Sequence, residues 1–156
     1  MEKIIKIGEK EVKLNNNVAW AMEYRDQFGK DIVPVITPLL AAFTEGISSV
    51  ISEAGTDLKD PKAIAAALEG RSMDILLPVF QLEFVDVIIN VLWAMAKAAD
   101  ETIEPPKRWV KQFDEFPLDV VVPEIYKLVV NGFVSSKNLE RLESVKDQLK
   151  KLQPSH

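Results

Sequence analysis

The longest hydrophobic stretch of the chain, residues 73–99, predicts a helix that is covered on almost every side. Twenty of its 27 residues are apolar. On a helical wheel, Glu83, Asp86, Asn90 and Lys97 fall within a sector of about 60°. So thin a polar stripe belongs either to the centre of a helical core or to an interface with another chain. The other segments each offer an apolar face that could surround this helix, so we place it at the centre of the core.

The first 14 residues predict a β-hairpin. Two short β-prone runs, residues 4–7 and 12–14, flank Gly8-Glu9-Lys10, a plausible turn. An isolated two-stranded hairpin is marginally stable in water, so its apolar face must pack on helices.

Four shorter helices follow from caps, glycines and prolines. Asn15–Asn17 supplies N-cap candidates for a helix over residues 17–28 that stops at Gly29. Thr37 as N-cap with Pro38 at the first helical position predicts a second helix to about Glu53, with Phe43 and Ile47 on its apolar face. Within it, Gly46 either weakens the helix or lets another backbone approach closely. A short helix is expected over residues 61–69, and Trp109, Phe113 and Phe116 suggest an aromatic face on another.

The pattern of an aspartate, three apolar residues and a proline occurs twice, at Asp74–Pro78 and at Asp119–Pro123. An acidic side chain favours a helix N-terminus, and proline is tolerated near the first turn. Both places therefore predict helix starts, with a kink at each proline as the alternative.

The C-terminal segment carries a near-heptad apolar stripe that must dock on this body, on a second copy or on a partner. The stripe consists of Leu139, Leu142, Val145, Leu149 and Leu152. We identify it as the candidate partner-binding surface. The predicted fold is therefore mainly α, with residues 1–135 as one helical domain that includes the hairpin and residues 136–156 as a C-terminal amphipathic helix and tail.

Composition excludes several classes of function. The net charge of −5 and the pI near 5.0 argue against nucleic acid as a partner. The absence of cysteine excludes disulfides, thiolate catalysis and cysteine-based zinc sites. No signal peptide is visible at the N-terminus. The charged residues within 73–99 would be costly in lipid, so we expect no membrane span.

No catalytic, cofactor or metal site is recognisable. The only histidine is His156, so Ser-His-Asp and Cys-His sites are absent, and neither a P-loop nor Gly-x-Gly-x-x-Gly occurs. Acidic pairs could hold a divalent ion or act in acid–base chemistry, but they also suit solvated helix edges and loops. These pairs are Glu83 with Asp86, Asp100 with Glu101, and Asp114 with Glu115. An aromatic set could likewise line a groove or belong to the core; it comprises Trp20, Trp93, Trp109, Phe113 and Phe116.

Several segments in order resemble the tail assembly chaperones of siphophages and prophages of Gram-positive hosts. They are the opening strand pair IIKIGEKEVKLNNN, the helix and stop WAMEYRDQFGKD, the stretch LWAMAKAADETIEPPKRWVKQFDEF at residues 92–116, and the apolar helix VVVPEIYKLV. The similarity covers most of residues 1–135 and lies in order and spacing rather than in a catalytic signature.

The resemblance implies a protein without enzymatic activity that binds the tape measure protein, keeps it soluble and helps to recruit the major tail tube protein. It implies action in the host bacterial cytoplasm and absence from the mature virion. It identifies no binding residue by motif. The alternative from the residues alone is a helical structural or adaptor protein that acts as a homo-oligomer.

Overall fold

The computed structural model describes residues 1–55, 59–81 and 84–133. This part of the chain is mainly α-helical and opens with a two-stranded antiparallel hairpin, as the sequence predicts. The elements are β1 (Glu2–Ile7), β2 (Lys10–Asn15), α1 (Ala19–Phe28), α2 (Ile32–Ala54), α3 (Pro61–Leu68), α4 (Ser72–Phe80), α5 (Val85–Ala99), α6 (Pro106–Trp109), the 3-10 helix η1 (Val110–Gln112) and α7 (Leu118–Phe133).

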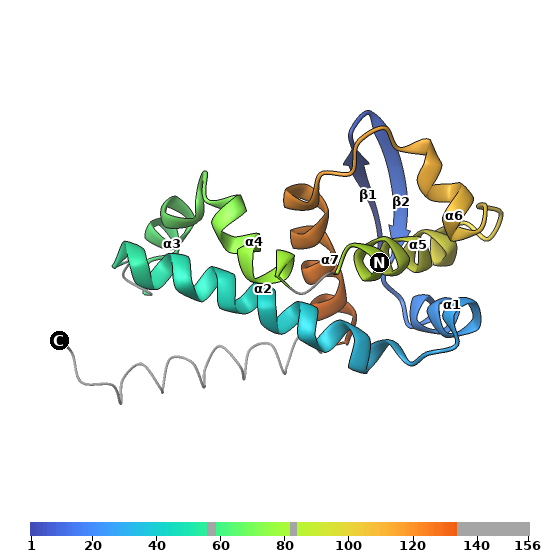
Figure 1. Cartoon of the computed structure of the whole chain (residues 1–156), viewed down its shortest axis with the longest axis horizontal. Helices are drawn as coiled ribbons and strands as arrows, with labels where there is room; N and C mark the ends of the chain where they lie inside the picture. Colours follow the sequence, from blue (N-terminus) through green and yellow to red (C-terminus); the bar gives the residue numbers. More distant parts are fainter. Residues whose placement is uncertain (56–58, 82–83, 134–156) are drawn as a thin grey trace.

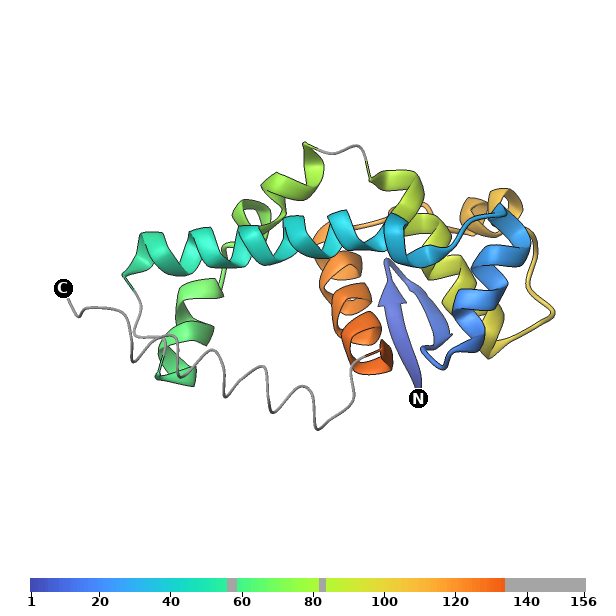
Figure 2. The same cartoon turned by 90° about the horizontal axis from the view of Figure 1, so that it is seen from below.

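The long helix α2 spans the molecule and joins two groups of elements (Figure 1). The hairpin lies with α1, α5 and α6 at one end, while α3 and α4 lie along the other half of α2. Helix α7 stands between these groups, which the second view shows as well (Figure 2). Buried side chains from the hairpin and from α1, α2, α4, α5 and α7 form one hydrophobic cluster.

The hairpin is anchored by one face, as its marginal stability requires. Ile7 pairs with Lys10 across the turn, where Gly8 has φ of +60°. The inward-facing side chains alternate with exposed ones along each strand and are buried against the helices. They are Ile5, Ile7, Val12 and Leu14.

The predicted first helix is confirmed. The side chain of Asn17 accepts a hydrogen bond from the Ala19 amide at 3.0 Å, and α1 ends at Gly29 in the left-handed region with φ of +69°. Its Phe28 ring meets the Trp93 ring of α5 edge to face at 5.9 Å.

The predicted start of the second helix, with Pro38 as its first residue, is wrong, because α2 begins six residues earlier, at Ile32. Asp31 is the N-cap, and its carboxylate accepts from the Val33 amide at 2.9 Å. Pro34 falls in the first turn, where an amide has no helical partner to lose. Pro38 is tolerated inside the helix.

The single helix predicted over residues 73–99 is also wrong. The stretch forms α4 and α5, whose axes differ by 106°, with residues 82–83 outside the described part. Each helix buries its own face: Leu76 and Val79 of α4 join the core beside α2, whereas α5 packs on α1 and the hairpin. Between the two helices only Gln81 and Glu83 interrupt the apolar residues, so the sequence reads as one apolar run. The central core position holds for α5, in which Ile88 and residues 91–96 are buried.

The helix starts predicted near Asp74 and Asp119 are confirmed, since both aspartates lie in the first turn, of α4 and α7 respectively. The aromatic helix predicted through Phe116 is wrong, because the helical turns end at Gln112. Phe113 is extended, yet its ring still contacts Trp109 at 5.0 Å and Phe116 at 5.8 Å.

Candidate functional site

An apolar groove of about 320 Å³ lies between α2, α4 and α7 beside α3. Its walls are almost entirely carbon, and its few polar groups lie on α4 and α7. Its lining consists of Phe43 and Ile47 from α2, Leu68 from α3, Ser72, Ile75 and Leu76 from α4, and Asp119, Pro123, Tyr126 and Lys127 from α7. A concave apolar site of this size suits one or two hydrophobic side chains of a partner.

The groove exists because α2 and α4 cross in backbone contact. A Cβ atom on Gly46 would lie 1.8 Å from the carbonyl oxygen of Ile75, so only glycine permits this approach. The close-approach alternative for Gly46 is therefore confirmed. Phe43 and Ile47 flank the glycine on α2 and face the groove from its α2 side.

Helix α7 supplies the opposite wall. The Tyr126 ring packs on the Phe43 ring with centroids 4.8 Å apart, and the Tyr126 hydroxyl lies 3.4 Å from the Thr44 hydroxyl. With its hydroxyl engaged, Tyr126 contributes mainly apolar ring surface. Pro123, one turn earlier, adds a rigid apolar surface without an amide hydrogen.

Two opposite charges of α7 border the groove. Asp119 lies in the first turn of α7, and Lys127 lies about 12 Å farther along the helix at 1.5 Å per residue. The exposed Lys127 ammonium is 3.9 Å from the carboxylate of the half-buried Glu124, which also pairs with Lys3. The groove therefore offers a negative group at one end of its α7 wall and a positive group at the other.

Arg71 fixes the start of α4, the helix that forms one wall of the groove. Arg71 precedes α4 and bridges the Asp74 carboxylate in the first turn of α4 and the Glu53 carboxylate near the end of α2. These two hydrogen bonds raise the pKa of the Arg71 guanidinium. They tie the start of α4 to α2 on the far side of the Gly46 crossing.

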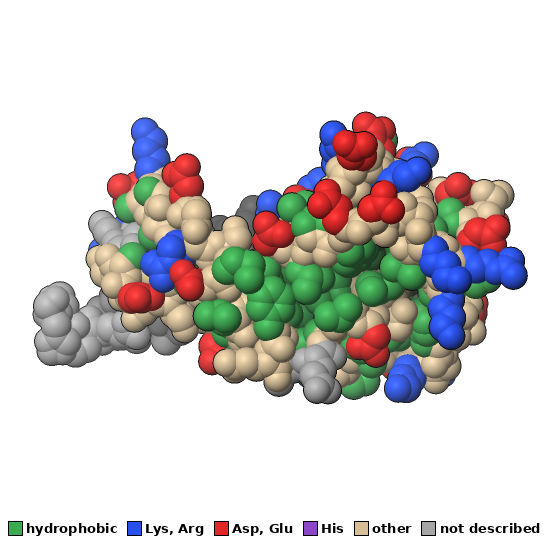
Figure 3. Space-filling model, turned by 45° about the horizontal axis from the view of Figure 1, so that its top comes forward, with side chains coloured by type: hydrophobic (Ala, Val, Ile, Leu, Met, Phe, Trp, Pro, Cys, Tyr) green, Lys and Arg blue, Asp and Glu red, His purple; other side chains and the backbone are tan. Residues whose placement is uncertain are grey.

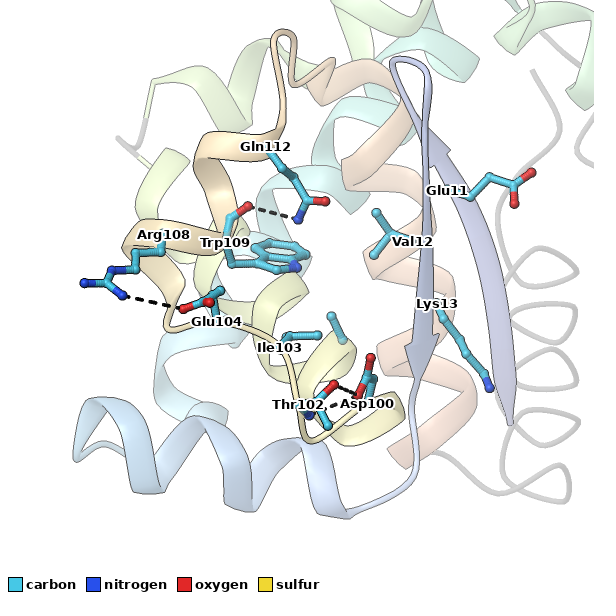
Figure 4. A pocket seen from close by; sticks show the side chains of 11 residues that line it. Glu11, Val12, Lys13, Asp100, Thr102, Ile103, Glu104, Arg108, Trp109 and Gln112 are labelled. Atoms are coloured by element: carbon cyan, nitrogen blue, oxygen red, sulfur yellow. Dashed lines mark hydrogen bonds and ion pairs between the residues drawn. The ribbon is translucent and has the colours of Figure 1, made fainter.

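A larger, polar pocket of about 460 Å³ lies between β2, the end of α5 and α6 (Figure 4). Val12 and Trp109 face each other across it, while Glu11, Lys13 and Arg108 extend away. Two cationic groups at its border form ion pairs: Arg108 is 3.9 Å from Glu104, and Lys13 is 3.2 Å from Glu2. The groups do not converge on a point where a ligand atom could sit.

The loop that closes this pocket is held by local hydrogen bonds. The Trp93 indole donates to the Glu104 carbonyl at 2.8 Å. Asp100 accepts from the hydroxyl and the amide of Thr102, which lowers the pKa of the Asp100 carboxyl. The side chains around the pocket therefore form a structural junction rather than a site for a small ligand.

The acidic pairs do not assemble a site in the part of the chain that the structure describes. Glu83 lies outside the described residues, whereas Asp86 is exposed on α5. The other four carboxylates are exposed as well: Asp100, Glu101, Asp114 and Glu115. Over residues 1–55, 59–81 and 84–133, no group of three potential ligands could hold a metal ion.

The aromatic set belongs mainly to the core. Trp20, Trp93 and Trp109 are buried, and Phe113 and Phe116 pack against the core at its edge. The Trp20 indole nitrogen is buried without a hydrogen-bond partner among the described residues. Nearby, burial of the Tyr24 hydroxyl raises its pKa, and the negative charge of Asp86 raises it further.

Hydrophobic side chains also reach the surface around the junction of α4 and α5. Figure 3 shows them as a continuous band over α4, α5 and α7. The large exposed hydrophobic residues of these helices include Leu77, Phe80, Val85 and Val120. Large contiguous apolar patches on a protein surface often mark interaction sites.

By length and composition, α2 could cross a membrane, and α4 with α5 passes the same test only as a bent pair. A third of the most apolar 18-residue stretch of α2 is buried inside the protein. Core helices of soluble proteins pass this test too, so it carries little weight.

Sequence reasoning placed the binding surface on the C-terminal stripe, which lies outside the described residues. It assigned Phe43 and Ile47 to an apolar helix face but did not bring Pro123 and Tyr126 to them. The one local signal was Gly46, since a glycine inside an apolar helix suggests a close backbone approach.

Comparisons with known proteins add no family assignment. No protein-family model matches the chain, and neither the curated proteins nor the solved structures contain a significant match.

Proposed function

We propose that this protein is a phage tail assembly chaperone that binds the tape measure protein and keeps it soluble. It acts in the host bacterial cytoplasm, helps to recruit major tail tube subunits and does not remain in the mature virion. It needs no enzymatic chemistry. The observation that carries the proposal is the apolar groove between α2, α4 and α7, because a client of hydrophobic helices requires such a surface.

The groove would capture one face of an amphipathic client helix. Hydrophobic side chains three and four residues apart on that helix would enter beside Phe43, Ile47 and Ile75. Burying one large aliphatic or aromatic side chain contributes about 1.5–3 kcal/mol. Two such anchors give a reversible interaction, which suits a chaperone that must release its client during assembly.

The acidic surface supports the same role. Net charge of −5 keeps copies of the protein apart and would help a complex with a hydrophobic client stay in solution. The exposed band over α4, α5 and α7 provides a second apolar surface, separate from the groove lining, for tail tube subunits.

Co-expression with the cognate tape measure protein tests the proposal. We expect the wild-type protein to co-purify with the tape measure protein and raise its soluble fraction. Ile47→Asp places a charge in the groove and should abolish both effects. Val33→Asp makes the same change at an exposed position of α2, outside the groove, and should preserve them. If the wild type neither co-purifies nor raises solubility, the proposal fails.

The exposed band also favours the alternative of a homo-oligomeric adaptor. Light scattering separates the two functions, because the adaptor would form a stable compact oligomer without affinity for tail proteins. If the protein is the adaptor, Val85→Asp in the band should dissociate the oligomer. If it is the chaperone, the same change should leave client binding in the groove intact.

A further inference from the structure

We infer that the polar pocket between β2 and α6 is a docking site for an extended segment of another protein, which pairs with β2 as a third, antiparallel strand of the hairpin sheet. The segment carries an acidic, an apolar and a basic residue in that order. This site is separate from the apolar groove, so the inference goes beyond the proposed function and does not depend on the identity of the client.

The outer edge of β2 has unpaired backbone groups. At the open end of the hairpin the Asn16 amide donates to the Met1 carbonyl, so every second residue before Asn16 directs its N–H and C=O toward β1. Glu11 and Lys13 fall between these positions, and their backbone groups point away from β1. In the part of the chain that the structure describes, no hydrogen bond reaches these groups. An unpaired strand edge is a template for a further strand.

The polar pocket lies along this edge and has room for one strand. Figure 1 shows β2 between β1 and α6, and the pocket is lined by residues 11–13 of β2 on one side and by α6 on the other. Three residues of an added strand occupy about 490 Å³, at about 3.4 Å per residue, 4.8 Å between strands and 10 Å between layers. The pocket measures about 460 Å³. The hairpin of a second copy would bring two strands and need about twice this volume, so a single extended segment is the occupant that fits.

The floor of the pocket suits an apolar side chain. Ala96 of α5, Ile103 of the following loop and Trp109 of α6 contribute apolar surface to it. Val12 faces Trp109 across the pocket (Figure 4). Side chains directly opposite each other on neighbouring strands lie on the same face of the sheet. The residue of the segment opposite Val12 would therefore direct its side chain onto this floor, where valine, isoleucine or leucine would be buried.

Two charges of β2 select the residues on either side of that apolar one. The side chains of Glu11 and Lys13 are exposed and extend away from the pocket (Figure 4). A basic residue opposite Glu11 and an acidic residue opposite Lys13 form favourable cross-strand pairs, whereas the reversed order places like charges together. In the antiparallel arrangement each of these two β2 residues also exchanges both backbone hydrogen bonds with its partner. Backbone pairing with pockets for alternate side chains is a common mode of peptide recognition.

Synthetic peptides added to the full-length protein test the inference. The probe is a fluorescently labelled peptide with the sequence of residues 10–15, KEVKLN, which contains the required order Glu-Val-Lys. Fluorescence anisotropy should show saturable binding at peptide concentrations up to about 1 mM. N-methylation of the glutamate in the peptide removes a donor that faces β2 and should weaken binding about tenfold. N-methylation of the final asparagine, which lies beyond the start of β2, should leave binding unchanged.

Two proline substitutions in the protein identify the strand edge. Glu11→Pro removes an amide hydrogen that points outward, so the hairpin keeps its own hydrogen bonds while an added strand loses its partner. This change should abolish binding of the probe. Lys6→Pro is the matched control, because Lys6 lies opposite Glu11 on β1, whose outer edge faces away from the pocket. It should leave binding unchanged.

Absence of saturable binding of the probe would overturn the inference, and so would equal binding of the peptide N-methylated at glutamate. Loss of binding in Lys6→Pro with retention in Glu11→Pro would overturn it too, because the peptide would then occupy the β1 edge. The N-methylated peptides act on the wild-type protein, so their result does not depend on the folding of either proline variant.

Discussion

Replacing Gly46 with alanine tests the packing that creates the groove. The added Cβ atom would lie 1.8 Å from the Ile75 carbonyl oxygen and 2.7 Å from the Ile75 carbonyl carbon. Cβ atoms in proteins essentially never come closer than 3.0 Å to such atoms, so α4 must move away by about 1.2 Å or more. The contact is with backbone, which cannot rotate aside as a side chain could.

Two effects of opposite sign determine the result. Alanine in place of glycine stabilises a helix by up to about 1 kcal/mol. Overpacking a well-packed contact costs about 1–3 kcal/mol, and a clash with rigid backbone belongs at the upper end. We therefore expect a net loss of about 2 kcal/mol in the free energy of unfolding. For a chain of this size, that corresponds to a fall in Tm of about 4–8 °C.

Thermal and urea unfolding followed by circular dichroism measure this loss. Ser48→Ala is a matched control, because it makes an exposed substitution to alanine two residues farther along α2. It should leave stability unchanged or raise it by up to about 0.5 kcal/mol. Gly46→Ala should also weaken client binding, since movement of α4 changes the groove wall that Ile75 forms.

A Gly46→Ala protein as stable as the wild type, or more stable, would refute the reasoning. Helix propensity alone predicts that outcome. It would mean that α2 and α4 do not cross in backbone contact, and the groove beside the crossing would lose its structural basis.

Three further predictions concern the core, a helix cap and an exposed carboxyl. Ile88→Asp buries an unpaired charge in α5 and should cost several kcal/mol, enough to abolish the cooperative unfolding transition; Leu142→Asp in the stripe should leave the body folded, so loss of structure in both would contradict the separation of core and stripe. Asp31→Ala removes the carboxylate that caps α2 and should lower stability by about 1 kcal/mol in urea unfolding, whereas no change would show that the cap contributes little. Thr102→Val removes the hydroxyl that lowers the pKa of Asp100, so NMR titration should show that pKa rising; its depression favours the folded state above the unfolded pKa, and this contribution is lost as the pH falls through the folded value.

Local signals were reliable where a single residue decides the backbone. Gly8 forms the hairpin turn and Gly29 ends α1 because each adopts a positive φ that other residues rarely take. Proline was less informative. Pro38 suggested a helix start, yet α2 already runs through it, because a better cap at Asp31 outweighs the loss of one amide donor.

The candidate site was only partly predictable. The sequence marked Phe43 and Ile47 as members of an apolar helix face, and it marked Gly46 as a point of close approach. It could not pair them with Pro123 and Tyr126, which lie about 80 residues away in the chain. Periodicity shows that a face is apolar but not which distant face it meets.

The sequence by itself determined the mainly helical class, the anchored hairpin and the lack of recognisable catalytic chemistry, because these depend on composition, short-range periodicity and backbone preferences. Only the tertiary structure decided that residues 73–99 turn by 106° into two helices, and that α2, α4 and α7 leave a groove between them. The physical reason is that each half of that apolar run gains more by packing on a different neighbour than by continuing as one helix. Such a choice depends on surfaces that meet only when the whole chain has folded.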